Sequence, residues 1–226
     1  MRKDYLKGIK IIYEDRDIIA IDKPPRLLTM ASATEKEKTA YHILTDYVRK
    51  GCAKSPKRVF IVHRLDRDTS GIVIFAKTEA AKNCLQDQWD QTEKKYLAVV
   101  YGKLAKESDT ITSYLAENAA HIVYSTQNKS IGKLSTTYYQ VLKETKDFSL
   151  LEINLITGRK NQIRVHLAEI GHPVVGDTKY GPKNNMYKSM ALHAHSISFL
   201  HPWNGKRMFL ETRIPFFFTN LVGNLK

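Results

Sequence analysis

The chain has 226 residues, of which 42% are hydrophobic and 26% charged, which is typical of a globular protein and gives ample material for a core. Its 36 Lys and Arg outnumber 23 Asp and Glu, for a net charge of +13; this suits a polyanionic partner, although a protein of the membrane surface would also be basic. We find no secretion signal, no apolar run of about eighteen residues and no metal spacing of the two cysteines, so we expect a cytoplasmic protein with reduced thiols and no membrane segment.

The first half of the chain alternates short strands with two helices. Apolar runs around the turn "EDRD" predict a hairpin that ends at Pro24. A helix is expected in "TAYHILTDYVRKG", with Thr39 as its N-cap and Gly51 just past its end. The runs "VFIV" and "GIVIF" predict strands on either side of a charged turn. An amphipathic helix, "EAAKNCLQDQWDQ", and a strand, "KKYLAVVYGKL", follow.

The second half is mostly β. Strands are expected in "TITSYLA", "AHIVYST", "LSTTYYQVL" and "SLLEINLIT", and again in "ALHAHSISFL" and "RMFLETRI". A short helix, "RKNQIRVHLAEIG", should turn Ile163, Leu167 and Ile170 toward the core. The segment "PFFFTNLV" is expected to be a packed tail. No repeat or linker divides the chain, so we predict one domain over residues 1–226, of the α+β class, with a large mixed but mainly antiparallel sheet and flanking helices.

The turn in "VFIVHRLDRDTSG" places Asp66 between two arginines. On an extended backbone Arg64 and Asp66 would face one side while Leu65 turns into the core. Neighbouring guanidinium groups favour an ionised carboxylate, which could act as a nucleophile, as a base or as half of an ion pair. From these residues alone, a solvated ion pair is the simpler interpretation.

Two further clusters could bind anions or bases. The helix start in "LITGRKNQIRVHL" has exposed amides together with Arg159 and Arg164, a combination that suits phosphate or carboxylate. Tyr96 follows two lysines, which suits base stacking beside phosphate. Packing within the sheet is the alternative for Tyr96, and a solvated surface position is the alternative for each arginine. The pair His193 and His195 has no third ligand at a suitable spacing, so no metal site is predicted.

Six segments together resemble a known family. "HRLDRDTSG" resembles the HRLDxxTSG signature of the RluA family of RNA pseudouridine synthases, and "KKYLAVVYG" and "TGRKNQIRVHL" are similar to its second and third motifs. "IDKPPRLLT", "GHPVVGDTKYG" and "LHAHSISFLHP" resemble further motifs in the same order, so the resemblance extends from about Ile9 to Pro215. It implies the catalytic fold of that family and isomerisation of uridine to pseudouridine in structured RNA, ribosomal or transfer or both, with no metal and no cofactor.

The resemblance also implies roles for single residues. Asp66 matches the catalytic aspartate, Tyr96 the tyrosine that stacks on the target base, and Arg164 the arginine that pairs with the aspartate. Arg64 matches the arginine thought to fill the stack that the flipped nucleotide leaves. Three further residues are expected to contact RNA: His63, Arg159 and Lys23.

One position departs from the family pattern. Asn161 stands where many relatives have His in TGRxHQIR. Asn can still donate and accept hydrogen bonds, so a positioning role would survive, whereas a role that needs an imidazole would not. A non-catalytic RNA-binding or ribosome-assembly factor of the same fold is therefore the alternative, and generic DNA binding rests on charge alone. A compact monomer that lacks the small N-terminal RNA-binding module of many relatives is the default expectation.

Overall fold

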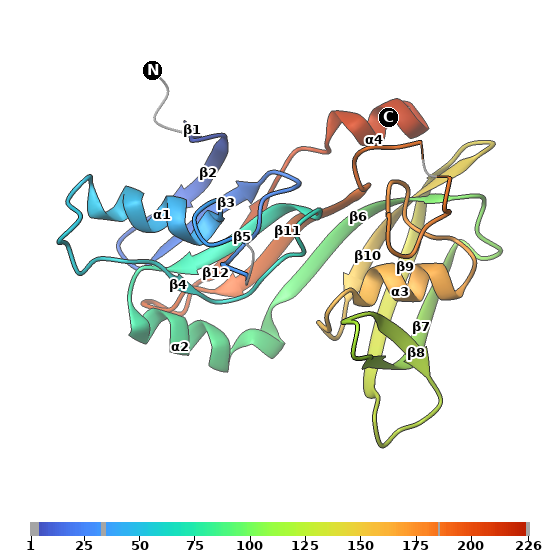
Figure 1. Ribbon diagram of the computed structural model, residues 1–226, viewed down its shortest axis with the longest axis horizontal. Helices are drawn as coiled ribbons and strands as arrows, with labels where there is room; N and C mark the ends of the chain where they lie inside the picture. Colours follow the sequence, from blue (N-terminus) through green and yellow to red (C-terminus); the bar gives the residue numbers. More distant parts are fainter. Residues whose placement is uncertain (1–4, 33–34, 185, 225–226) are drawn as a thin grey trace. The chain divides into compact units, whose positions relative to one another are not determined.

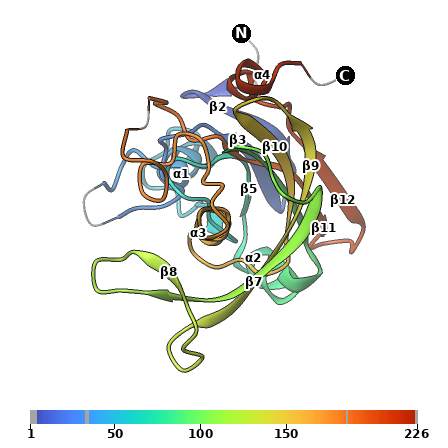
Figure 2. The ribbon, with the colours of Figure 1, turned by 90° about the vertical axis from the view of Figure 1, so that its right-hand side faces the viewer.

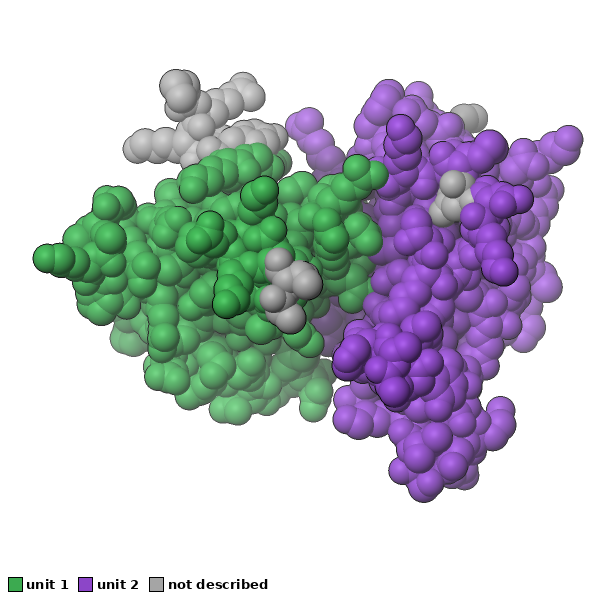
Figure 3. Space-filling view, in the orientation of Figure 1, with its two compact units in different colours: residues 1–93, 194–212 green, residues 94–193, 213–226 purple. Residues whose placement is uncertain are grey.

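The computed structural model describes residues 5–32, 35–184 and 186–224. The chain forms two compact units, coloured separately in Figure 3: unit 1 consists of residues 1–93 and 194–212, and unit 2 of residues 94–193 and 213–226. The strands pair mainly antiparallel and are accompanied by α-helices, which confirms the predicted α+β class. Within the described residues, no helix has the length and apolar character needed to cross a membrane. The single catalytic domain over residues 1–226 stays a prediction.

Unit 1 is built on a sheet in the order β1-β2-β3-β5-β11, with β4 paired to β5 and β12 paired to β11 (Figure 1). The strands are β1 (Tyr5–Leu6), β2 (Ile9–Glu14), β3 (Ile18–Lys23), β4 (Phe60–Ile61), β5 (Ser70–Ala76), β11 (Leu192–Leu200) and β12 (Arg207–Glu211). The predicted hairpin is β2–β3. Its turn is closed by Asp15, whose Oδ1 accepts hydrogen bonds from the backbone N–H groups of Asp17 and Ile18, each at 2.8 Å.

The helices of unit 1 begin at threonine caps. Helix α1 (Ala40–Arg49) starts after Thr39, whose Oγ1 accepts from the His42 N–H at 3.1 Å, and Gly51 lies just past its end, as predicted. Helix α2 (Glu79–Asp87) is capped by Thr78 and leads into a short 3-10 helix, η1 (Trp89–Gln91). Apolar side chains of α2 pack with those of the sheet in one core: Ile18, Ala20, Val62, Ile72, Ile74, Ala76, Ala81, Leu85, Ile197, Phe199 and Leu210.

Unit 2 has the strand order β6-β10-β9-β7-β8. These strands are β6 (Glu93–Tyr101), β7 (Ser108–Glu117), β8 (Val123–Thr126), β9 (Lys133–Glu144) and β10 (Phe148–Leu155). Helix α3 (Gln162–Glu169) packs against β7, β8 and β9, within the curve of this sheet (Figure 2). The expected C-terminal packed tail forms a short helix, α4 (Phe216–Val222), which lies against β10 and buries Phe218 and Val222.

Helix α3 differs from its prediction at both ends. It begins at Gln162, because Asn161 has a left-handed backbone with φ 54° and cannot be part of the helix. Ile163 and Leu167 are buried as predicted, but Ile170 is 36% exposed. The prediction for Ile170 was wrong because the helix ends one residue earlier, at Glu169.

Gly71, the second residue of β5, lies at a close approach between two strands. Its φ is +110°, and a Cβ atom there would lie 2.6 Å from the backbone nitrogen of Ala194 in β11, and closer still to its carbonyl oxygen. No L side chain fits this position without a backbone shift, so the glycine is required by the strand packing.

We therefore expect Gly71→Ala to lower the free energy of unfolding by more than about 2 kcal/mol, because strain and displaced backbone add together. Urea denaturation of the purified variant would measure this. Gly158→Ala is the matched control, since a Cβ at Gly158 meets nothing within 4 Å. Equal stability of the two variants would contradict the assignment.

Candidate active site

The predicted catalytic aspartate lies on the loop between β4 and β5 of unit 1. Leu65 is buried, with 8% of its surface exposed, while Arg64 is exposed and Asp66 is partly buried. This is the alternation expected for an extended backbone, with the two charged side chains turned away from the core. The Arg64 Nη1 lies 3.4 Å from the Met30 sulfur.

Thr29 fixes the backbone immediately before Asp66. Its buried hydroxyl accepts from the Leu65 N–H at 3.2 Å and donates to the Leu65 carbonyl at 3.0 Å. The Thr29 carbonyl in turn accepts from the N–H of Tyr41, in the first turn of α1, at 3.0 Å. The helix start and the loop are thus joined through one threonine, because unpaired amides at a helix N-terminus need acceptors.

Lys23, at the end of β3, also binds the backbone of this loop. The side chain is fully buried, and its ammonium group donates to three backbone carbonyls, those of Pro24 at 3.1 Å, Leu27 at 2.8 Å and Arg67 at 3.1 Å. The last contact ties the end of β3 to the residue that follows Asp66. The three donors of the ammonium group are therefore occupied by the protein itself, and the predicted contact of Lys23 with RNA stays a prediction.

Burial sets the charge state of Lys23. It lowers the pKa of the amine to about 8, although the carboxylates of Asp68, Asp66 and Asp22 favour the charged form. The amine therefore keeps its proton at neutral pH, and the neighbouring carboxylates favour that state.

His63 completes the link between β4 and β5. Its Nε2 accepts from the Ile74 N–H at 3.0 Å, so this nitrogen carries no proton. The ring lies against Trp89 of η1, with ring centroids 4.7 Å apart. These contacts give His63 a role in shaping the loop, and its contact with RNA stays a prediction.

In unit 2, Tyr96 lies in β6 opposite Ile153 of β10 and is 9% exposed. The neighbouring Lys95 pairs with Glu152 at 2.8 Å. The stacking role of Tyr96 stays a prediction.

Arg164 is buried and held at two edges. Its Nε and Nη2 donate to the two carboxylate oxygens of Asp177 at 2.7 and 2.8 Å, and its Nη1 donates to the Asn161 side-chain oxygen at 3.0 Å. The sequence placed Arg164 off the buried stripe of α3, with its side chain turned outward or into a cleft. The helix instead buries both faces at this point, because Asp177 supplies an internal counter-charge.

Asp177 is the acid that makes this burial possible. Burial by itself raises the pKa of its carboxyl, but the hydrogen bonds and charge of Arg164 and the N–H groups of Tyr180 and Lys179 outweigh it, so the pKa lies below 3.8. The carboxylate is therefore ionised at neutral pH, and the pair is a charge-assisted, bidentate contact.

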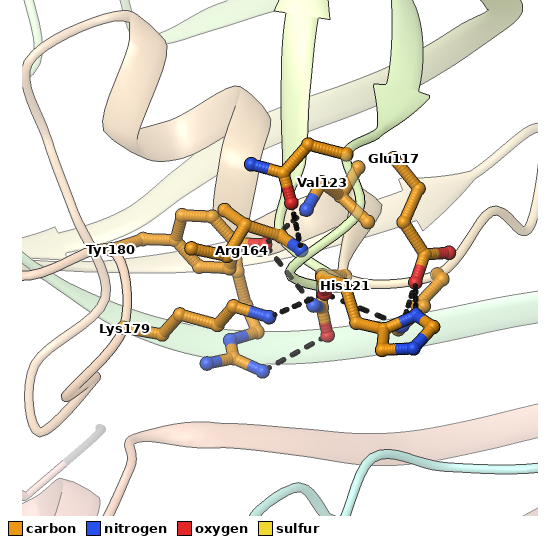
Figure 4. A network of polar contacts seen from close by, with 10 residues as sticks. Glu117, His121, Val123, Arg164, Lys179 and Tyr180 are labelled. Carbon is orange, nitrogen blue, oxygen red and sulfur yellow. Dashed lines mark hydrogen bonds and ion pairs between the residues drawn. The ribbon is translucent and has the colours of Figure 1, made fainter.

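Tyr180 lies over the guanidinium group. The Arg164 Cζ is 5.1 Å from the centre of the Tyr180 ring. The Tyr180 hydroxyl oxygen accepts from the Asn161 amide at 3.1 Å and from the N–H of Val123, the first residue of β8, at 3.2 Å. Figure 4 shows Arg164 and Tyr180 within this network of polar contacts.

The turn between β7 and β8 belongs to the same network (Figure 4). The His121 carbonyl accepts from the Lys179 ammonium group at 2.9 Å. Glu117 pairs with Lys160 and with His121, whose hydrogen bonds lower the pKa of the Glu117 carboxyl. Lys160, before α3, and Lys179, in the loop after it, thus both contact the end of β7 and the turn that follows it.

Gln162 fixes the start of α3. Its side-chain oxygen accepts from the Thr157 hydroxyl at 2.8 Å and from the Arg159 N–H at 3.0 Å. Its amide donates to the Thr136 carbonyl at 3.0 Å and to the Thr137 hydroxyl at 2.9 Å. The Arg159 side chain is exposed, and its predicted RNA contact stays a prediction.

Sequence reasoning missed Asp177, Tyr180 and Gln162. The segment "GDTKYG" was included in a stretch that resembles a family motif, but no role was assigned to its residues. Its glycines were the available signal: a Cβ at Gly176 would collide with the backbone of Ser189, so this segment must pack tightly inside the protein. Among the residues that the structure describes, no group of three or more His, Cys, Asp or Glu is arranged to hold a metal ion.

Comparison with known proteins decides the family. Residues 17–169 match the family described as RNA pseudouridylate synthase. The chain belongs to this family. It is therefore an RNA pseudouridine synthase, an isomerase, and the resemblance drawn from its motifs is confirmed.

The relatives of this pseudouridine synthase cover most of its length. It is 32% identical to "Uncharacterized RNA pseudouridine synthase YlyB" of Bacillus subtilis, over 96% of this chain and 73% of the relative. It is 36% identical to "Ribosomal large subunit pseudouridine synthase C" of Rickettsia bellii, over 93% of this chain and 70% of the relative. The solved structure "Human RNA Pseudouridylate Synthase Domain Containing 1" superposes with a TM-score of 0.75 at 25% identity, covering 96% of this chain and 87% of that one, which supports the same fold.

We expect Lys23→Met to be less stable than the wild type, with a difference that widens from pH 8 to pH 10. The folded protein releases its buried proton above about pH 8, whereas the unfolded lysine keeps its proton up to about pH 10.4, so wild-type stability gains up to about 3 kcal/mol over this interval. Urea titrations at both pH values would measure the difference. Lys146→Met, at an exposed loop lysine, is the control; a constant difference for Lys23→Met would refute the shifted pKa.

Asp177→Asn should lower the free energy of unfolding at pH 7 by about 3–5 kcal/mol, because it leaves a buried guanidinium without its counter-charge. Since the folded pKa of Asp177 is depressed, its stabilisation is present above about pH 4 and is lost as the pH falls through the folded value. The difference in unfolding free energy between the wild type and the variant should therefore narrow between pH 7 and pH 3 in denaturant titrations. A gap of the same size at both ends would mean that the charge of Asp177 is unimportant.

Proposed function

We propose that this enzyme converts uridine to pseudouridine in ribosomal RNA, with transfer RNA as a second candidate substrate, and that Asp66 is its catalytic carboxylate. Residues 1–226 would act as one catalytic domain, in the cytoplasm, as a monomer and without a metal ion or cofactor. The observation that carries the proposal is the loop of Asp66: an exposed arginine precedes the acid, and Thr29 and Lys23 fix the backbone on either side of it.

The reaction requires a carboxylate and a way to hold a detached base. The N1–C1′ bond of uridine breaks, the uracil rotates and a C5–C1′ bond forms; the hydrogen on C5 leaves to solvent as a proton, and N1 takes up a proton from solvent. Covalent addition of Asp66, at the ribose or at the uracil ring, would divide this displacement into easier steps. Arg164 is proposed to keep the carboxylate ionised and oriented.

The target nucleotide must first leave its stack, at a cost of a few kcal/mol. Arg64, which is exposed beside the catalytic loop, is proposed to enter the gap. Tyr96 is proposed to stack on the flipped base. His63, Arg159 and Lys23 are the further RNA contacts predicted from the sequence, and of these Arg159 has the exposed side chain that a phosphate contact needs.

Ribosomal RNA is favoured because two groups of relatives are named ribosomal large subunit pseudouridine synthases, C in Rickettsia and D in Haemophilus influenzae. The net charge of +13 suits any folded RNA and does not choose between substrates.

The alternative is an RNA-binding factor of the same fold without catalysis. Its motivation was the net charge of +13 together with Asn161 in place of the motif His. The contacts of Asn161 argue against it, because its amide accepts from Arg164 at 3.0 Å and donates to Tyr180 at 3.1 Å.

The test uses RNA labelled with tritium at C5 of uridine, since isomerisation expels that hydrogen. Ribosomal and transfer RNA transcripts would be incubated separately with the wild type, with Asp66→Ala and with Asp87→Ala, an exposed acid at the end of α2. We expect release by the wild type and by Asp87→Ala, and a loss of at least about a thousandfold in Asp66→Ala, as for removal of a nucleophile.

Release by Asp66→Ala at the wild-type rate would show that another residue carries the reaction. No release by the wild type from any RNA, together with tight binding, would favour the non-catalytic alternative.

A further inference from the structure

Asn161 has an unusual backbone conformation, which restricts the residue types that fit its position. It has φ 54° and ψ 13°, in the left-handed region, directly before α3, and it is 9% exposed. Asn is one of the few non-glycine residues that adopt this conformation readily. The left-handed turn directs the side chain toward Arg164 and Tyr180 and not outward along the helix.

Both ends of the Asn161 amide are used, and their orientation is fixed by the partners. A guanidinium group can only donate, so the Arg164 Nη1, at 3.0 Å, must face the side-chain oxygen. The amide nitrogen then donates to the Tyr180 hydroxyl oxygen at 3.1 Å. This position therefore needs one acceptor toward Arg164 and one donor toward Tyr180.

Two other contacts also constrain Arg164. Asp177 takes the Nε and Nη2 edge, and the Tyr180 ring covers one face of the guanidinium group at 5.1 Å. Asn161 accepts a hydrogen bond from Nη1, which adds a third fixed point to the plane of the group. Through Tyr180 and the Val123 N–H, the same amide is connected to the first residue of β8.

We propose that Asn161 is a positioning residue that sets the orientation of Arg164 through this acceptor–donor pair, so that the rate of isomerisation depends on it while RNA affinity does not. The proposal rests on the proposed function, in which Arg164 acts on Asp66. Because an amide does not titrate, the contact persists at every pH at which the protein is folded.

A histidine at this position offers a direct way to test the hydrogen-bond pattern. A neutral imidazole accepts with one nitrogen and donates with the other, so it can replace the amide. A protonated imidazole has two donors and a positive charge beside Arg164, so it cannot. Asn161→His should therefore work at high pH and fail at low pH, and the Arg164 charge should keep the imidazole pKa at or below its ordinary value of about 6.5.

The experiment compares wild type, Asn161→Ala, Asn161→His, Asp66→Ala and the control Asn83→Ala, an exposed asparagine on α2. Single-turnover tritium release is measured from saturating RNA between pH 5.5 and pH 8.5, RNA affinity by filter binding, and folding by circular dichroism at each pH. We expect Asn161→Ala to lose about tenfold or more in rate while its RNA dissociation constant stays within about threefold of the wild type, as for a group that acts on the reaction and not on binding.

The decisive readout is the ratio of the Asn161→His rate to the wild-type rate. We expect it to lie within about fivefold of one at pH 8.5 and to fall by up to about tenfold per pH unit below the imidazole pKa. Taking the ratio removes any pH dependence that Asp66 or the RNA contributes. The same folded variant is compared with itself at two pH values, so the test survives even if Asn161→Ala does not fold.

The outcomes separate the two proposals. If the wild type releases no tritium, the proposed function fails first. If the wild type is active and Asp66→Ala is not, a ratio for Asn161→His that is flat with pH, or equal losses of rate and affinity in Asn161→Ala, overturns the positioning role alone.

Discussion

The architecture around α3 depends on the burial of one cation. A guanidinium group that leaves water must be neutralised and must find acceptors for its donors, or it costs several kcal/mol. Asp177 meets the first demand for Arg164, and it is in turn held by the N–H groups of Lys179 and Tyr180. The tight backbone path of the 176–181 segment follows from this need, because the acid has to reach the helix from the following loop. Arg164, predicted to be catalytic, is thus fixed by a segment that lies outside its own motif, "TGRKNQIRVHL".

Lys23 solves the same problem in unit 1 by a different route. Its ammonium group lies on neutral carbonyl oxygens and not on a carboxylate, and the acids around it act only through space. Burial lowers the pKa of Lys23 to about 8, although the neighbouring carboxylates favour the charged form. Both cations serve as anchors for backbone near residues predicted to be catalytic. In unit 1 the ammonium group of Lys23 binds loop carbonyls, and in unit 2 the planar guanidinium group of Arg164 binds the Asp177 carboxylate with two parallel hydrogen bonds.

Local patterns in the sequence predicted most of the elements, because their causes are local. The hairpin β2–β3, helix α1 with its Thr39 cap, and the strands on either side of Asp66 follow from periodicity and turn residues. The motifs identified the family correctly. Local patterns do not predict the contacts of Asp177 with Arg164 and of Tyr180 with Asn161, because these partners lie 13 and 19 residues away along the chain. The burial of Arg164 and the exposure of Ile170 depend on the same distant contacts and on where α3 ends, neither of which helical spacing determines.

Asn161 shows why residue identity is a poor guide at a position of this kind. By residue identity, Asn161 lacks the imidazole that the motif His provides. That difference was one reason to consider a protein without catalysis. Compared by hydrogen bonds, Asn161 keeps an acceptor for Arg164 and a donor for Tyr180, which are the two functions a neutral imidazole would offer. The left-handed backbone before α3 accepts Asn at little cost. The substitution therefore conserves the chemistry that surrounds Arg164 while removing a group that could titrate, and the departure from the motif gives no support to a loss of activity.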